Sequence, residues 1–303
     1  MEQRSSITSL MSSFGRAYHS ENAKNPVFDD FKARELMTDD EYRSIAGYIL
    51  GGIDFFAPEM KGKFESGEKA LEYLVNTQIA PTPLGRAAFC EESLKTAVRT
   101  GTKQYVILGA GMDTFAFRNP GFAGRCEIFE VDHPLTQADK KSRIERARWQ
   151  IPDGLHFVPI DFTKDDLREA LLKSGFDPRK KTFFSWLGVS MYLCRDDIEK
   201  MLDCIASLSA DGSDLVFDYA DAGFFLSEVK RVRNMLAMAK AGGEEMKSGF
   251  DQMSLELMLA DQGFLVYEHL GSHDIQKRYF SARTDGLSAF EHIGYVRACL
   301  KRR

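Results

Sequence analysis

The sequence has 303 residues, of which 44% are hydrophobic and 28% charged, and its formal net charge is -5 at pH 7. This composition is typical of a globular protein, and the negative charge excludes a general attraction to nucleic acid or anionic membrane. No segment reaches the ~18 apolar residues of a membrane span, and the N-terminus lacks the apolar run of a signal peptide, so we expect a cytoplasmic protein. The five cysteines have no CxxC or Cys/His ligand spacing, which favours buried free thiols and no metal site.

The first hundred residues show helical patterns and no strand signal of comparable strength. Apolar spacing predicts helices over residues 6–19, 67–77 and 83–100, and another over 38–53 that begins at a Thr-Asp-Asp cap. We therefore divide the chain into a helical cap with a lead-in helix (1–100) and an α/β domain (101–303). One large domain with such an elaboration suits this chain length.

Beyond residue 100, short apolar runs alternate with helical stretches, as in a parallel sheet with crossover helices. We expect seven strands: six over residues 104–108, 127–131, 156–160, 182–186, 214–219 and 264–269, and a last one within 287–298. A largely helical insertion at about 222–250 separates the fifth and sixth strands and ends in AGGEEMKSG, which we expect to be flexible. A lid over the sheet and a plain surface helix both remain open for this insertion.

The first strand leads directly into a glycine turn, Gly109-Ala110-Gly111. Such a turn places unhindered backbone amides at the carboxyl edge of the sheet, where open α/β folds bind nucleotide-like ligands. A dinucleotide fingerprint has a third glycine or alanine three places later, but this chain has Thr114 there, preceded by Asp113. An aspartate at this place repels a pyrophosphate and accepts a cation. S-adenosylmethionine (SAM), which carries a sulfonium and an ammonium but no phosphate, satisfies this pattern.

Acidic residues also end the next two strands. Glu130 and Asp132 are two residues apart on one face of the second strand, and a carboxylate at its tip can accept both ribose hydroxyls. Because NAD and SAM both carry this ribose, the feature does not choose between them. At the end of the third strand, Asp161 can accept from the adenine amine and Phe162 can lie near the ring. A helix N-cap and a core residue would give the same pattern.

Four strand tips taken together, LGAGMDTFAFR, FEVDHP, FVPIDF and FFSWLGVSMYL, resemble the leucine carboxyl methyltransferase family of SAM-dependent methyltransferases. With RAYHS, NPVFDDFKARELM and GRAAF, the chain is more similar to the bacterial small-molecule branch, which includes polyketide O-methyltransferases of the tetracenomycin type. The resemblance runs from about Arg16 to the C-terminal strand. It implies an α/β fold of the class I methyltransferase type, with a Rossmann-like, mostly parallel seven-stranded sheet whose last strand is antiparallel. The predicted helical cap would cover the carboxyl edge of this sheet.

The resemblance also implies roles for the strand-tip residues. The glycine turn would line the methionine portion of SAM, and Asp132 would hold the ribose, with His133 beside it among the cofactor contacts. Asp161 and Phe162 would take the adenine.

Three further positions bear on the cofactor. Arg86 matches a family arginine that pairs with the methionine carboxylate, which suits the bidentate grip of a guanidinium; a helix-capping surface arginine is the alternative. Tyr192 falls at a family position beside SAM, or in the core. The chain departs from the family at Leu187, where many members have a glutamate, so an acidic partner for the SAM ammonium is missing there. Asp113 or backbone carbonyls would substitute.

Catalysis of methyl transfer depends mainly on positioning, with the methyl group ~3 Å from the acceptor oxygen. A carboxylate acceptor needs no base, whereas a phenol, with a pKa of about 10, would benefit from one. His19 and His133 are the candidate bases, with structural roles as the alternative, and Tyr192 is the remaining catalytic candidate. His19 ranks first because it belongs to the cap, where Arg16, Tyr18 and His19 lie within one helical turn and could converge on one pocket.

The leading hypothesis is a SAM-dependent O-methyltransferase, monomeric or homodimeric, that acts on a hydroxyl or carboxyl oxygen of a small molecule, with polyketide-like metabolites among the acceptors. The nearest variants are a protein C-terminal carboxyl methyltransferase and a non-catalytic SAM-binding relative. From a different class comes a nicotinamide-dependent dehydrogenase, which Asp113-Thr114 and the absence of a second nucleotide-binding half disfavour.

Overall fold

The computed structural model describes residues 7–162 and 164–302. Seven strands form one sheet in the order β3-β2-β1-β4-β5-β7-β6, and of these strands only β7 runs antiparallel to the others. Their bounds are β1 Gln104–Leu108, β2 Glu127–Asp132, β3 Leu155–Pro159, β4 Thr182–Trp186, β5 Asp214–Ala220, β6 Phe264–Leu270 and β7 Ile293–Leu300. The predicted class of sheet and its antiparallel last strand are confirmed, and the six strands predicted with bounds differ from the observed ones by one residue at most at either end.

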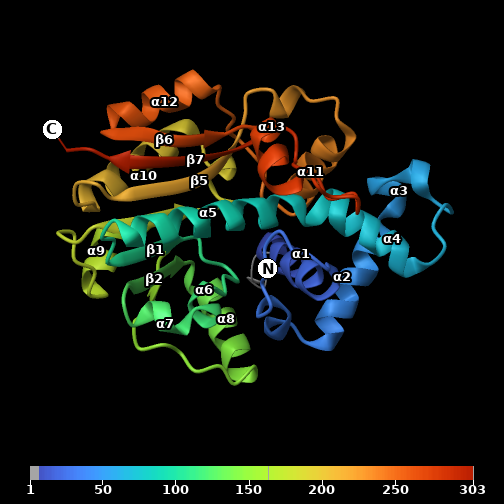
Figure 1. The fold of residues 1–303 in the computed structure, drawn as a ribbon, viewed down its shortest axis with the longest axis horizontal. Coiled ribbons are helices and arrows are strands. Elements are labelled where there is room, and N and C mark those ends of the chain that lie inside the picture. The colour runs from blue at the N-terminus through green and yellow to red at the C-terminus, as the bar shows by residue number, and fades with distance from the viewer. Residues whose placement is uncertain (1–6, 163, 303) are drawn as a thin grey trace.

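Helices cover both faces of the sheet, which explains the continuous apolar runs of its central strands. Every residue of β1, β4 and β5 is buried. On one face, Tyr105 and Ile107 of β1 belong to the apolar cluster that includes α5 (Pro81–Arg99). On the other face, Val106 and Leu108 pack into the cluster formed with α10 (Arg195–Leu208) and α12 (Gln252–Asp261). Figure 1 shows α5 running along the full length of the sheet.

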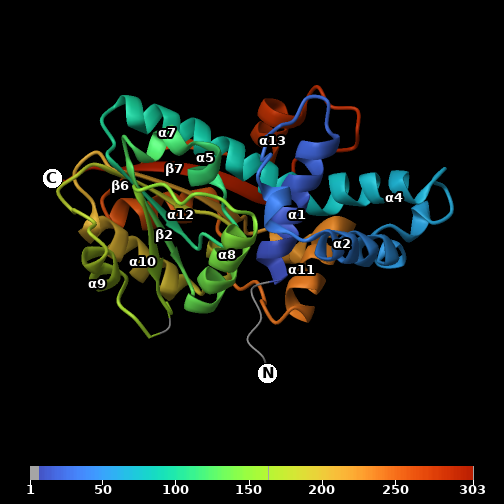
Figure 2. The same ribbon diagram turned by 90° about the horizontal axis from the view of Figure 1, so that it is seen from below.

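The N-terminal helices lie beyond the carboxyl ends of the parallel strands (Figures 1 and 2). They are α1 (Ile7–Asn22), α2 (Asp39–Gly51), α3 (Ile53–Phe56) and α4 (Gly67–Leu74). The predicted start of α2 is confirmed by a capping box, in which Glu41 N donates to Thr38 Oγ1 at 3.1 Å and Thr38 N donates to Glu41 Oε2 at 2.8 Å. A π-helical turn, Val75–Ile79, joins α4 to α5 almost without a break, so the cap is continuous with the helix that packs on the sheet.

The insertion between β5 and β6 packs beside the helical cap. Its helix α11 (Lys230–Ala241) lies against the cap, where Asn234 Nδ2 donates to the Phe56 carbonyl at 3.2 Å and Lys230 pairs with Glu59 at 2.7 Å. The segment after α11 was expected to be flexible, but it is hydrogen-bonded along the tips of β4 and β5. Phe250 N donates to the Ala220 carbonyl at 3.0 Å, and Lys247 N donates to the Met191 carbonyl at 2.7 Å.

Apart from α8, the other helices are short, and several of them were not predicted, above all those between β6 and β7. The further helices are η1 Ala33–Leu36, η2 Pro58–Met60, α6 Phe115–Arg118, α7 Pro120–Ala123, α8 Pro134–Arg146, α9 Leu167–Lys173, η4 Ser190–Tyr192, η5 Phe224–Leu226, α13 Ser272–Ile275 and the π-helical η6 Gln276–Phe280. The cysteines are free as expected, with Cys90 and Cys126 buried, but Cys194 is exposed. Among the described residues, no helix has both the length and the apolar content needed to cross a membrane.

Candidate active site

Two adjoining cavities lie at the carboxyl ends of the strands. The first has a volume of about 630 Å³ and is bordered by the glycine turn after β1, by α1 and α5, and by the segment after β4. The second has a volume of about 1120 Å³ and is bordered by α1, α2, α3, the start of α5 and α11. Residues that border both are Thr8, Ser12, Pro83, Arg86, Tyr192 and Glu244. The first volume lies within the ~300–1,000 Å³ usual for small-ligand sites.

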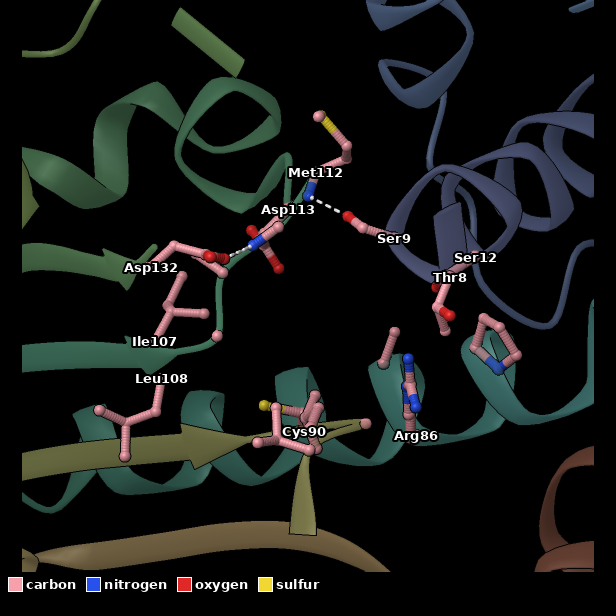
Figure 3. Close-up of a pocket in the computed structure, with 18 of the residues that line it drawn as sticks. Thr8, Ser9, Ser12, Arg86, Cys90, Ile107, Leu108, Met112, Asp113 and Asp132 are labelled. Carbon is pink, nitrogen blue, oxygen red and sulfur yellow. Dashed lines mark hydrogen bonds between the residues drawn. The ribbon is translucent and has the colours of Figure 1, made fainter. Parts of the chain in front are cut away.

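The glycine turn is shaped by close contacts with two neighbouring segments. Gly109 and Gly111 have φ angles of 72° and 50°, a region in which other residues are strained. A Cβ at Gly109 would lie 2.7 Å from Val189 of the β4 tip, and one at Gly111 would lie 2.5 Å from the Ser9 hydroxyl of α1. Met112 N also donates to Ser9 Oγ at 3.1 Å (Figure 3). The glycines therefore let both the β4 tip and the cap approach the turn.

Asp132 lies at the end of β2, as predicted, and borders the first cavity. Its carboxylate accepts hydrogen bonds from Gly111 N and, at 2.6 Å, from His133 N. Burial raises the pKa of Asp132, although these two amides oppose the shift.

Glu130, two residues earlier, does not reach the cavity, because its side chain is buried beside Lys140 of α8, with which it forms an ion pair. Burial raises the pKa of Glu130 to about 7 even though Lys140 opposes the shift. Of these two acids of β2, Asp132 therefore borders the cavity and Glu130 forms a buried ion pair.

Arg86 points from α5 into the space shared by the two cavities (Figure 3). Its Nη1 donates to Asp218 Oδ2 at 3.1 Å, and Gly188 N donates to Asp218 Oδ1 at 2.6 Å. Asp218 is fully buried in the middle of β5. Because a guanidinium has five N–H groups, this pairing leaves room for a second anionic partner. Asp218 was not among the predicted site residues, although an acid within the apolar run LVFDYA is a signal for it.

A buried charge cluster fastens the cap to the glycine turn, and sequence reasoning missed it. Asp30 accepts from Arg16 Nε at 2.8 Å, lies 3.1 Å from Arg118 Nε and also accepts from the Thr114 hydroxyl. Burial alone would raise the pKa of Asp30, but Arg16 and Arg118 lower it below its usual value. Arg16 Nη2 donates to the Met112 carbonyl at 2.8 Å as well. Thr114, at the position of the third fingerprint glycine, therefore binds the cap.

Of the remaining predicted cofactor residues, His133, Asp161 and Phe162 lie at the same edge of the sheet but outside the borders of the two cavities. Asp113 does border the first cavity, where its carboxylate accepts from Phe115 N at 2.7 Å. His133 caps α8, with its Nδ1 accepting from Leu135 N at 3.3 Å. Asp161 pairs with Lys164 at 2.7 Å, and Phe162 is exposed. The adenine contacts of Asp161 and Phe162 stay predictions.

The structure does not bring His19 to either cavity. The side chain is 2% exposed, and its Nε2 accepts a hydrogen bond from Val27 N at 3.0 Å. Burial, followed by the charge of Arg283, lowers its pKa to about 4. Tyr18 likewise lies away from both cavities, against Phe14, so Arg16 alone of the three borders the first cavity. The expected convergence is wrong, and a structural role accounts for His19.

The second cavity is mostly apolar, and methionines are prominent in its border. Its apolar border residues include Met11, Ile45, Tyr48, Phe55, Phe56, Ile79, Met191, Met235, Met238 and Met246. Tyr192 lies where the two cavities meet, and burial raises its pKa to about 12. Among the described residues no histidine borders either cavity, and no group of three His, Cys, Asp or Glu side chains could hold a metal ion.

Comparison with known proteins decides what this architecture is. The family model described as leucine carboxyl methyltransferase matches residues 9–206. The chain belongs to this family. It is 45% identical over 303 residues, 99% of either chain, to the Bacillus subtilis protein named "Putative S-adenosyl-L-methionine-dependent methyltransferase YktD". A Mycobacterium marinum protein named in the same terms is 34% identical over 225 residues, which cover 73% of this chain and 68% of the relative.

Two solved structures of low sequence identity share the fold. One is a "putative methyltransferase" from Thermobifida fusca, with a TM-score of 0.56 and 14% identity over 99% of this chain and 96% of that one. The other is a DUF574 family protein from Streptomyces avermitilis, with a TM-score of 0.55 and 13% identity over 84% of this chain and 95% of that one. Both support the class I methyltransferase fold and nothing finer.

The family and its relatives establish SAM as the cofactor, and the first cavity fits it. Asp113 and Asp132 border that cavity with carboxylates, which suit a cationic ligand without phosphates, and Arg86 suits the carboxylate of its methionine portion. The nicotinamide alternative is therefore set aside. Leu187 also borders this cavity, so at the position of the missing family glutamate the first cavity is bordered by an apolar side chain.

Proposed function

We propose that this methyltransferase transfers the methyl group of SAM to an oxygen of a small, largely apolar molecule held in the second cavity. The observation that carries the proposal is the apolar cavity of about 1120 Å³ that adjoins the cofactor cavity. Both are bordered by Arg86 and Tyr192, so an acceptor in one can meet a cofactor in the other. Flexible methionine side chains can adapt to an irregular apolar ligand.

Residues around the shared space favour an acceptor that is already ionised. When bound, SAM supplies an electrophilic methyl group, so the acceptor oxygen must present a lone pair. No described histidine borders either cavity to take up a proton, and Tyr192, whose pKa is about 12, stays protonated at neutral pH. Its hydroxyl can donate a hydrogen bond that orients an anionic oxygen. We therefore propose a carboxylate or an acidic hydroxyl as the methylated group.

In this proposal the other residues bind and orient. Asp132 holds the ribose and Arg86 the carboxylate of the cofactor, while α1 covers the glycine turn and excludes water from it. Rate enhancement then comes from positioning the acceptor oxygen in line with the methyl group. A protein C-terminal carboxylate is the second candidate acceptor, because the matching family model carries the description leucine carboxyl methyltransferase.

A panel of acceptors separates these candidates. Formation of S-adenosylhomocysteine would be measured with apolar carboxylic acids, with phenols of graded pKa, with apolar amines and with a peptide that ends in leucine. We expect turnover with apolar acids and with the more acidic phenols, and a decline as the phenol pKa rises. Turnover of the peptide alone, or of amines alone, would contradict the proposal.

A cavity-filling substitution tests the location. Met235 borders the second cavity from α11, and Met235→Trp should lower kcat/KM for the best acceptor roughly tenfold by overfilling the space. SAM binding should not change. Met253→Trp is the matched control, because Met253 is exposed on α12. Equal effects of the two substitutions would place the acceptor elsewhere.

A further inference from the structure

The cofactor of this family requires an anionic partner that Leu187 cannot supply. SAM carries an ammonium and a carboxylate on one carbon atom, and burial of an ammonium is costly unless it is paired. Arg86, the proposed partner of the carboxylate, borders both cavities. The partner of the ammonium should therefore also lie near the junction of the cavities.

Three other acids that border the first cavity form ion pairs within the chain. Asp30 and Glu91 pair with Arg118, and Asp30 also pairs with Arg16. Glu245 is exposed and pairs with Lys240 at 3.5 Å.

Asp113 and Asp132 each accept from the backbone of the glycine-turn region, Asp113 from Phe115 N and Asp132 from Gly111 N. Neither borders the second cavity, whereas Glu244 borders both cavities, as Arg86 does.

Glu244 is held in this place by the end of α11. Gly243 has a φ of 79°, and its N–H donates to the Lys240 carbonyl at 3.1 Å while Glu244 N donates to the Ala239 carbonyl at 2.9 Å. These two bonds form a Schellman motif, in which a glycine in the left-handed conformation ends the helix. Three residues later, Lys247 N donates to the Met191 carbonyl, so both flanks of Glu244 are fixed.

The surroundings of Glu244 connect three parts of the fold. The Thr8 hydroxyl of α1 donates to Glu244 Oε2, and the segment that carries Glu244 is bonded to the tip of β4. Tyr192 is close enough to both charges that Arg86 lowers its pKa and Glu244 raises it, each secondary to burial. Arg86, Tyr192 and Glu244 all border both cavities, so a cation partner and an anion partner for the two charges of an amino-acid group lie at the same junction.

We propose that Glu244 binds the ammonium group of SAM and replaces the glutamate that is absent at Leu187. The insertion then contributes to the cofactor site as well as to the acceptor cavity. This inference rests on SAM as the cofactor and not on the chemistry of the acceptor. Binding of the cofactor product can therefore test it in the absence of any acceptor.

The experiment is calorimetric titration of the full chain with S-adenosylhomocysteine and with its deamino analogue, in which hydrogen replaces the ammonium group. Glu244→Gln should weaken S-adenosylhomocysteine binding roughly 10- to 100-fold, the usual effect of losing a charge-assisted hydrogen bond. The deamino analogue should bind the variant and the wild type equally. Glu228→Gln is the matched control on the insertion, since Glu228 is exposed and pairs with Arg233 at the surface.

Three other binding results would overturn the proposal. Equal losses for both ligands in Glu244→Gln would indicate that Glu244 only shapes the site. No loss for either ligand would exclude Glu244 as a contact. If Asp113→Asn alone caused the loss that depends on the ammonium, Asp113 would be the partner instead. Thermal unfolding of each variant with its ligand absent shows whether the fold is intact.

Discussion

Replacing His19 with glutamine separates a catalytic role from a structural one. In the structure His19 is buried in α1, away from both cavities, and its Nε2 accepts a hydrogen bond from Val27 N at 3.0 Å. The side-chain oxygen of glutamine can accept the same hydrogen bond. It cannot titrate, so the His19→Gln variant isolates the effect of protonating the imidazole.

The size of the expected change in stability follows from the pKa of His19, which burial and the charge of Arg283 lower from 6.5 to about 4. At ~1.36 kcal/mol per pH unit, this difference corresponds to roughly 3 kcal/mol. Because the folded state favours the neutral ring, this stability is present above pH 6.5 and is lost as the pH falls toward about 4. Most of the loss should appear between pH ~7 and ~4.5.

Urea denaturation of both proteins, monitored by circular dichroism at several pH values, measures this contribution of His19 to the free energy of unfolding. The free energy of unfolding of the wild type, minus that of the variant, should fall by roughly 2 to 3 kcal/mol across the interval. Turnover at neutral pH should be unchanged. A parallel pH dependence in the two proteins would refute the assigned pKa and its cause. A large loss of turnover in a stable variant that still binds SAM would return His19 to the mechanism.

Three further tests concern Asp132, Arg86 and the buried ion pair of Glu130 and Lys140. Asp132→Ala should weaken SAM binding at least ~10-fold, because it removes the acceptor proposed for the ribose hydroxyls, and calorimetry that found no change would exclude that contact. Arg86→Lys keeps a positive charge beside Asp218 but loses the bidentate fork, so it should weaken SAM roughly tenfold and leave adenosine binding unaltered; equal losses would make Arg86 structural. Lys140→Met should lower the free energy of unfolding by roughly 3 to 5 kcal/mol, since it leaves Glu130 buried without its partner, and adding Glu130→Leu should restore most of it. A double variant as unstable as the single one in urea would contradict this account.

The sheet could be predicted closely because burial on both faces leaves a plain trace in the sequence. Strands such as β1 and β4 are short, continuous apolar runs bounded by turns, and their predicted bounds match the observed ones. The same logic failed after β6, where α13 and the π-helical Gln276–Phe280 lie. These segments are too short for a helical period to stand out, and their position depends on packing between distant parts of the chain.

The strand-tip residues of the site were predictable for a different reason. In a parallel sheet the carboxyl ends meet at one edge, so Asp132 and the glycine turn had to lie close together. Which side chain turns inward was not predictable: Glu130 has the same chemistry as Asp132 and the same face of β2, yet it pairs with Lys140 in the interior. No such rule applies to the cap. The direction of the His19 side chain depends on how the helix packs against a distant edge of the sheet, and residue spacing along the helix does not reveal that packing.

The two glycines of the turn have a role in packing as well as in the predicted cofactor site. Both were predicted because a cofactor needs exposed amides, but the structure adds a second reason: Gly111 admits Ser9 of α1, and Gly109 admits Val189 of the β4 tip. The turn proposed to receive the cofactor is therefore also the surface on which the cap docks. The proposed acceptor cavity, in contrast, is bordered by α2, α3 and α11 and not by the turn. If the acceptor binds there as proposed, changes in the cap and the insertion can alter the acceptor while the proposed contacts of the strand tips with SAM are kept, and the acceptor preference is to be sought in those helices.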